Sequence, residues 1–390
     1  MLAIKNGKLV TIANGVIENG TLLVDGNKIV AIGPKVAIPA EAQVIDASGK
    51  FVTPGIIDAH AHVSIWEEGL GWEGIDVNET TNPITAAVRA IDAINPDELG
   101  LHDAYQNGVT CIWCAPGSAN VIGGEGVTMR TYGETVDEMI MLSPSGIKAA
   151  TGENPKGAYG SRNQMPKTRM GVAALLRETL VKAQNYQRRI EKAADNPEKM
   201  PARDLGLENM VKVLKRELPL RAHCHRADDA MTIVRVAQEF NIKVTIEHAT
   251  EGYKVALELA KHGVPIVVGP TLSCRSKIEV RDSSLATPAM CAEAGVKVAL
   301  MTDHPVIPVW YLPICAGVAV RHGLDEAVAM RAITLTPAEI CGVADRVGSL
   351  EVGKEADIVI WDGHPFEYTT HVDYTIINGS IVYQRQYKLY

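Results

Sequence analysis

Short apolar stretches alternate with amphipathic stretches between residues 55 and 344, and this alternation constrains the fold more than any other feature of the chain. Strands that are joined through helices run parallel, so the pattern predicts an α/β fold, either a closed barrel or a doubly wound sheet. No Gly-x-Gly-x-x-Gly fingerprint of a dinucleotide-binding sheet follows a strand. The expected strands include 109–114, 220–223, 243–248, 265–268 and 296–301, and the expected helices include 228–240, 252–262 and 325–333.

The two ends of the chain follow a different pattern. Residues 1 to 50 place short apolar runs between Asn-Gly and Asp-Gly pairs, which are turn residues of tight β-hairpins. Residues 356 to 383 repeat this pattern around Asn378 and Gly379. Two β-rich ends therefore flank the α/β middle. Within the middle, the long, charged stretch 171–217 is expected to form inserted surface helices.

Composition limits the classes of partner. The 390-residue chain is 46% hydrophobic and 22% charged, as in an ordinary globular protein. Its net charge is -8, and the sequence has no block of like charges. These two features argue against nucleic-acid and membrane partners and favour a small-molecule substrate. The N-terminus lacks a secretory signal pattern, and no stretch approaches the roughly 18 apolar residues of a membrane span. We expect a cytoplasmic protein; a homo-oligomer is compatible with the sequence, but no feature fixes the number of subunits.

The seven cysteines do not form the pattern of a disulfide framework, because they are odd in number and scattered through apolar surroundings. Cys111 and Cys114 have the spacing of a redox or metal motif, but they lie in an expected strand with no second pair nearby. We interpret them as small buried hydrophobic residues with reduced thiols.

Asp58-Ala59-His60-Ala61-His62 ends the first expected strand of the middle region. Side chains two positions apart on a strand share a face, so His60 and His62 can converge on one ion. Imidazole is the commonest nitrogen ligand of catalytic metals. One such pair is weak evidence by itself, since most are surface or packing residues.

Further polar residues stand where later apolar strands end. In parallel barrels the active site forms at the carboxyl ends of the strands, so separate strands can deliver these groups to one pocket. Several histidines in corresponding positions favour a metal site over isolated core histidines. The residues concerned are His223, His225, His248 and Asp303.

These segments resemble the amidohydrolase superfamily, particularly the branch that contains imidazolonepropionase and the metal-dependent Xaa-Arg prolidases. The resemblance rests on residues 54–62 and 348–359 and extends over nearly the whole chain. It implies a (β/α)8 TIM barrel over residues 55–344. It also implies a small β-sandwich built from both chain ends, residues 1–54 and 345–390.

The resemblance also implies the ligands of one or two divalent metal ions. His60 and His62 match first-strand ligands, His223 a fifth-strand ligand, His248 a sixth-strand ligand and Asp303 the eighth-strand carboxylate. His225 matches a second fifth-strand histidine of the dipeptidase-like members.

Two residues compete for the position of the bridging ligand. Lys148 resembles the fourth-strand lysine that many relatives carry as a carbamate formed with carbon dioxide. Glu153 offers a carboxylate at the strand mouth, as in branches that use glutamate. Their separation of five positions places them on opposite faces of a regular strand, so they are not expected to be ligands together. Glu153 is slightly favoured because it lies nearer the strand end, although a buried ion pair for Lys148 or a helix-capping role for Glu153 stays open.

The resemblance implies a hydrolytic mechanism. A bound divalent ion acidifies water and polarises the scissile carbonyl. Zinc is the first expectation, but nitrogen and oxygen ligands also accept manganese, iron, cobalt or nickel. Asp303 would act as general base and then general acid, and His225 would hold the carbonyl oxygen as negative charge develops. The candidate substrate contacts are Tyr159, Arg162, Arg275 and His304. Of these, Arg275 suits a substrate carboxylate.

The predicted function is hydrolysis of a carbon–nitrogen bond in an amide, cyclic amide or peptide-like substrate. Deamination of a heterocycle at the same site is an alternative within the enzyme class. A catalytically silent barrel scaffold is a third interpretation, but the presence of a full candidate ligand set argues against it. Substrate identity lies in the loops and does not follow from the fold.

Overall fold

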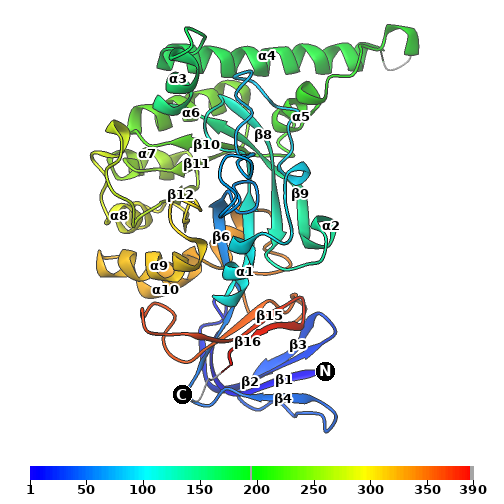
Figure 1. Cartoon of the computed structure of the whole chain (residues 1–390), viewed down its shortest axis with the longest axis vertical. Helices are drawn as coiled ribbons and strands as arrows, with labels where there is room; N and C mark the ends of the chain where they lie inside the picture. The colour runs from blue at the N-terminus through cyan, green and yellow to red at the C-terminus, as the bar shows by residue number, and fades with distance from the viewer. Residues whose placement is uncertain (194–195, 387–390) are drawn as a thin grey trace.

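The computed structural model describes residues 1–193 and 196–386, and these residues form two separate eight-stranded sheets. Figure 1 shows an α/β unit above and a smaller β unit below, with α1 between them. The blue strands from the start of the chain and the red strands from its end lie together in the lower unit. The chain therefore enters the α/β unit from the β unit and returns to it.

The sheet of the α/β unit follows the chain strand by strand, from β6 to β13. Its two edge strands are brought together where they end: Asp303 N donates to His60 O at 3.2 Å, and His62 N donates to His304 O at 2.9 Å. The predicted barrel of eight strands is confirmed. The strands are β6 (Ile56–Ala61), β7 (Val109–Cys114), β8 (Ile122–Arg130), β9 (Ile140–Ala150), β10 (Leu220–Cys224), β11 (Val244–His248), β12 (Ile266–Val268) and β13 (Val298–Leu300).

One strand departs from the expected parallel order. β8 is antiparallel to both β7 and β9, whereas the other neighbouring pairs of this sheet are parallel. The reason lies in the connections: residues 115–121 are too few for the helical crossover that a parallel neighbour requires. The chain turns back instead, and a second short connection, residues 131–139, reverses it again.

Helices cover the outside of the barrel, and α4 and α5 occupy the expected surface stretch at the end far from the lower sheet (Figure 1). The α-helices are α1 (Leu99–Gln106), α2 (Val136–Met139), α3 (Glu153–Gly160), α4 (Arg169–Ala193), α5 (Leu205–Leu214), α6 (Ala227–Phe240), α7 (Ala256–Lys261), α8 (Thr287–Glu293), α9 (Leu312–Arg321), α10 (Glu326–Ala332) and α11 (Leu335–Ile340). The 3-10 helices are η1 (Ala90–Asp92), η2 (Pro197–Lys199), η3 (Gly252–Val255), η4 (Ile278–Val280) and η5 (Val309–Tyr311). Among the described residues, no helix has the length and apolar character needed to cross a membrane.

The lower sheet combines strands from both chain ends, as expected. β5 pairs with β1 on one side and with β14 on the other, so the last strands extend the sheet that the first strands begin. Its apolar residues form a core of their own, separate from those of the barrel. The strands are β1 (Leu2–Val10), β2 (Val16–Asp25), β3 (Lys28–Gly33), β4 (Gln43–Asp46), β5 (Phe51–Pro54), β14 (Ile358–Trp361), β15 (Val372–Ile377) and β16 (Ser380–Gln384). The boundaries near residues 55 and 344 stay predictions.

Apolar side chains fill the inside of the barrel beneath the strand ends. Ile57 and Ala59 from β6 pack with Trp113 from β7, Val267 from β12 and Ala299 from β13. Cys111 and Cys114 are buried with free thiols. The barrel is therefore a packed support for groups at its rim.

Candidate metal centre

Six side chains of the ligand type converge at the carboxyl ends of the barrel strands. They come from β6, β10 and β11, from the positions just after β6 and β10, and from the segment after β13. Within each of two groups, the ligand atoms all lie within 4.8 Å of one another. The first group is His60, His62 and Asp303, and the second group is His223, His225 and His248.

Asp303 holds the first group together. Its Oδ1 atom lies 3.4 Å from His60 Nε2 and 3.3 Å from His62 Nε2. The backbone of Asp303 has φ 56°, and that of His248 has φ 68°. This left-handed conformation is costly for a residue with a side chain, and such strain concentrates at functional sites. Here it turns both side chains from the strand ends into the site.

The second group contains a buried histidine without a hydrogen-bond partner. Neither ring nitrogen of His223 has a partner among the described residues. The His223 ring centroid lies 4.2 Å from that of His248 and 4.6 Å from that of His225. Burial lowers the pKa of His223 well below its ordinary value, so the ring is neutral and can donate a lone pair. A buried unpaired nitrogen costs about 1–3 kcal/mol, and a divalent metal ion is a partner that would remove this cost. The donor set therefore fits a metal.

Hydrogen bonds fix which nitrogen faces the site. His62 Nδ1 lies 2.7 Å from Ala115 O, and His248 Nδ1 lies 3.0 Å from Gly269 O. Because a carbonyl oxygen only accepts, each of these Nδ1 atoms must carry the proton. The Nε2 lone pair of each ring then remains for a metal ion.

His60 is supported by a buried ion pair inside the barrel. His60 Nδ1 lies 2.8 Å from Glu247 Oε2, and Arg221 Nε donates to Glu247 Oε1 at 2.8 Å. The Arg221 guanidinium stacks 3.6 Å from the centroid of the Trp113 ring. Neither Arg221 nor Glu247 is exposed to solvent. A carboxylate behind a metal-binding histidine orients the ring and raises its basicity, and Glu247 occupies that position here.

Lys148 on β9 lies next to the first group. Its Nζ is 2.9 Å from His60 Nε2, and the side chain is fully buried. Burial lowers the pKa of Lys148 to about 8, against the raising effect of Asp303 and Glu247. A lysine with this pKa carries some uncharged amine near neutral pH, which is the form that reacts with carbon dioxide.

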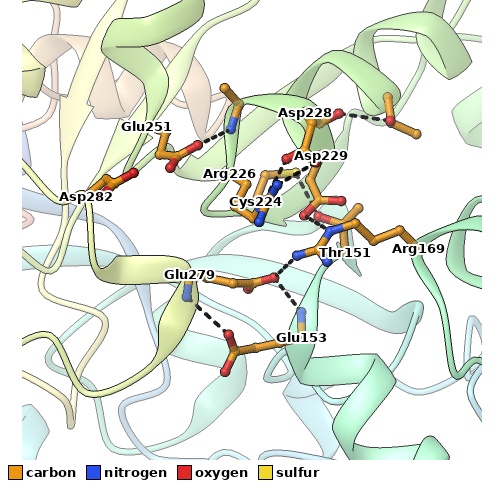
Figure 2. Close-up of polar contacts among 12 residues, drawn as sticks. Thr151, Glu153, Arg169, Cys224, Arg226, Asp228, Asp229, Glu251, Glu279 and Asp282 are labelled. Carbon is orange, nitrogen blue, oxygen red and sulfur yellow. Dashed lines mark hydrogen bonds and ion pairs between the residues drawn. The ribbon is translucent and has the colours of Figure 1, made fainter.

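Glu153 lies at the start of α3. Its backbone N donates to Glu279 Oε1 at 2.7 Å, and its Oε2 accepts from Glu279 N at 3.2 Å (Figure 2). Because β9 ends at Ala150, strand alternation does not reach Glu153. Glu153 belongs to neither ligand group.

A cavity of about 600 Å³ opens onto both groups. The segment after β6 forms one wall, where Trp66 and Asn78 face the cavity. Further lining residues come from residues 269–286, which connect β12 to α8 and are named the β12–α8 loop below. The size suits a small organic substrate.

Comparison with known proteins identifies the family. A model described as "Amidohydrolase family" matches residues 51–382, which is most of the chain. The chain belongs to the amidohydrolase family.

Relatives of this amidohydrolase support the same fold. An amidohydrolase from Thermotoga maritima MSB8, known as a crystal structure, superposes with a TM-score of 0.96 at 40% identity, covering 99% of this chain and 100% of that chain. Amidohydrolase tasK from Hapsidospora irregularis is 28% identical over 376 residues, which are 90% of this chain and 38% of that protein. The chain thus spans 38% of the length of that relative. Imidazolonepropionase from Brucella anthropi is 24% identical over 377 residues, covering 89% of this chain and 88% of that protein.

The four predicted substrate contacts of the amidohydrolase do not line the cavity that holds both groups. The buried Tyr159 hydroxyl donates to Asn120 at 2.5 Å, and the exposed Arg162 donates to Thr80 O at 2.8 Å. The role of each as a substrate contact stays a prediction.

The other two predicted contacts lie close to the cavity. Arg275, on the β12–α8 loop, donates to Arg281 O at 2.9 Å and lines a neighbouring cavity of about 740 Å³. His304 is buried, and its Nδ1 accepts from Val309 N at 3.2 Å. Arg275 is therefore held by its own loop, whereas His304 Nε2 is buried without a hydrogen-bond partner among the described residues.

Sequence reasoning missed several residues that shape the site of this amidohydrolase. Arg221 and Glu247 support His60, and Asp58 accepts from Thr302 N at 3.1 Å, which joins β6 to the end of β13. Burial raises the pKa of Asp58 to about 7. The sequence could have indicated all three, because each is a charged residue within an apolar strand. An unpaired charge is costly at such a position, so each should have a partner.

Proposed function

We propose that this amidohydrolase hydrolyses a carbon–nitrogen bond of a small substrate, in an amide, cyclic amide or peptide-like group. The observation that carries the proposal is the pair of facing ligand groups in one cavity, with both nitrogens of His223 buried and unpartnered. We assign His60, His62 and Asp303 to one divalent ion and His223 and His248 to a second. The imidazole and carboxylate donors make zinc our first choice of metal.

We further propose that Lys148, rather than Glu153, lies between the two ions as a carbamate. The Lys148 amine nitrogen would form a bond to the carbon of carbon dioxide and lose a proton, leaving a carboxylate. Its position 2.9 Å from His60 Nε2 supports this role. Glu153 is less suitable because one of its carboxylate oxygens already accepts from the Glu279 backbone.

The residues of the site can carry the proton transfers of hydrolysis. A divalent ion, when bound, would supply Lewis acidity to the scissile carbonyl and acidify the attacking water. Asp303 would take the proton of that water and deliver it to the departing nitrogen. His225 Nδ1 lies 2.8 Å from Thr250 Oγ1, which holds the ring so that Nε2 can donate to the carbonyl oxygen.

We also propose a cellular compartment for the protein. The described cysteines are all free thiols, which supports a reducing compartment such as the cytoplasm. Self-association stays a prediction, and light scattering of the purified chain would measure it.

The test combines metal analysis with turnover. The metal-reconstituted protein is assayed against N-acyl amino acids, dipeptides, lactams and imidazolones, and its metal content is measured by elemental analysis. In His60→Ala we expect loss of metal and a fall in kcat/KM of at least about 100-fold, because outer partners alone are worth 10–100-fold. The matched control is His371→Ala, which removes an exposed histidine just before β15 of the lower sheet.

Each other outcome has a distinct meaning. Full turnover by metal-free protein would contradict the proposal. Ammonia release without ring or peptide cleavage would indicate the deaminase alternative. Stoichiometric metal without any turnover in the panel would favour the scaffold interpretation.

A further inference from the structure

Lys277 is the one lysine or arginine among the described residues that line the cavity of the metal centre. It lies on the β12–α8 loop. His223, His225 and His248 of the second ligand group line the same cavity as Lys277. The ammonium group is therefore close to the expected position of the scissile bond.

The Lys277 ammonium has few partners within the chain. Nζ donates to Asn154 Oδ1 at 2.8 Å. It forms no ion pair within 4.0 Å with any carboxylate in the part of the chain that the structure describes, although Glu153 and Asp303 line the same cavity. An ammonium group has three donors, so two remain for another acceptor.

Contacts of a neighbouring residue hold the loop segment that carries Lys277. Two residues further along, Glu279 accepts from Arg169 at 2.6 Å and from Glu153 N at 2.7 Å (Figure 2). Gly152 permits this contact: it has φ +76°, and a Cβ there would lie 2.4 Å from Glu279 Oε1. These contacts of Glu279 anchor the β12–α8 loop to α3 and α4, and Lys277 lines the cavity.

The charge of the loaded cavity favours an anionic ligand group. Without metal, the charges of Glu153 and Asp303 outweigh that of Lys277. Each divalent ion reverses this balance by adding two positive charges. A substrate that carried a cation near Lys277 would meet repulsion, whereas a carboxylate would gain a charge-assisted hydrogen bond.

We propose that Lys277 binds a carboxylate of the substrate and thereby selects amides that carry a carboxylate beside the scissile bond. N-acyl amino acids, dipeptides and carboxylated lactams belong to this class. This inference rests on the proposed function, because it places the scissile bond at the metal centre. It assigns the carboxylate contact to Lys277 instead of Arg275, whose guanidinium is held by backbone carbonyls of its own loop.

The test uses two probes that differ only in the carboxylate, N-methylphosphonyl-L-alanine and N-methylphosphonyl-L-alaninamide. Their binding to the zinc-loaded protein is measured by calorimetry, which does not depend on turnover. We expect the wild type to bind the carboxylate form roughly 10- to 100-fold more tightly than the amide form, as is typical of a hydrogen bond to a charged group. Lys277→Met should abolish most of this difference, and Lys277→Arg should retain part of it.

Arg275→Gln is the matched control, because it removes a cation two positions away on the same loop and should leave the preference intact. Equal binding of the two probes by the wild type would overturn the inference, as would a preference that survives in Lys277→Met. Loss of the preference in Arg275→Gln alone would assign the contact to Arg275 and also overturn it. Binding of neither probe would contradict the inference as well.

The two proposals can fail separately. Hydrolysis of the substrate panel with equal binding of both probes would leave the proposed function standing without the role of Lys277. A carboxylate preference that requires Lys277, together with no hydrolysis of any panel compound, would support Lys277 and contradict the proposed function.

Discussion

Two residues compete for one role at the metal centre, and single substitutions can separate them. Lys148 lies against His60, whereas Glu153 is bound to the Glu279 backbone. We expect Lys148→Ala to lose about one metal ion per chain, because it removes the proposed bridging group. Glu153→Gln should keep the metal content of the wild type. Elemental analysis of both variants, purified with bicarbonate present, measures the difference.

Acetate provides the control for the lysine variant. Lys148→Ala leaves a space in which a small carboxylate can replace the carbamate, so added acetate should restore part of the metal content. A Glu153→Gln variant that loses metal while Lys148→Ala retains it would reverse the assignment. Circular dichroism shows whether either variant has failed to fold.

The candidate ligand residues were predictable from the sequence because each one interrupts an apolar strand where it ends. His60, His223 and Asp303 all follow this rule, and the structure gathers them with their partners into two ligand groups that border one cavity. Side-chain direction was not predictable. Arg275 and Lys277 are two positions apart on one loop, yet only Lys277 lines this cavity. That choice depends on the contacts of Glu279 with residues more than a hundred positions away.

At the scale of elements, the β12–α8 loop depends on Glu279 for its position. Glu279→Gln removes a buried charge that pairs with Arg169 at 2.6 Å. We expect amide hydrogen exchange in residues 269–286 to rise by roughly 10- to 100-fold, because a charge-assisted hydrogen bond stabilises the loop by about 1.5–3 kcal/mol. The KM for carboxylated substrates should increase more than kcat changes.

The control for this element is Glu239→Gln, which breaks an exposed pair with Arg177. Exposed pairs are worth about 0–1 kcal/mol, so exchange in the β12–α8 loop should not change. Unchanged exchange in Glu279→Gln would show that the loop is held by other contacts. Mass spectrometry of both variants under the same conditions makes the comparison direct.

The strand–helix alternation predicted the barrel but not the direction of β8. The run from Ile122 to Arg130 contains three glycines and a glutamate, so its strand propensity is weak although all nine residues are buried. The short connections before and after β8 indicate its antiparallel direction, because they are too short for helical crossovers. Connection length was therefore a better guide at this point than the pattern of the strand itself.

At the scale of the whole molecule, the barrel and the lower sheet are joined by a buried ion cluster. Arg130 on β8 donates to Glu355 at 2.6 Å and lies 3.2 Å from Asp357, just before β14. Glu355 and Asp357 lie within residues 348–359, one of the two segments that carry the family resemblance. The structure supplies a physical reason for that segment: it returns the chain to the lower sheet and neutralises a buried arginine of the barrel.

The stability of the metal-free protein should depend steeply on pH, and the direction follows from the buried histidines. Burial lowers the pKa of His60, His223, His225 and His248 well below 6.5, so all four are neutral in the folded state. The unfolded chain takes up protons at these residues once the pH falls below about 6.5. It then binds more protons than the folded chain, and folding stability decreases as the pH falls from 6.5 toward the folded-state pKa values.

Each of these histidines contributes up to about 1.4 kcal/mol of lost stability per pH unit in this window. Urea unfolding of the chelator-treated protein at pH 7, 6 and 5 measures the sum of these four losses and the smaller, opposite effect of Asp58, whose raised pKa adds stability as the pH falls. His225→Asn should give a shallower dependence, because one buried imidazole is removed while a polar side chain remains beside Thr250. Stability that is constant or increasing between pH 7 and pH 5 would contradict the burial of neutral imidazoles, and with it the preformed donor set that the metal centre requires.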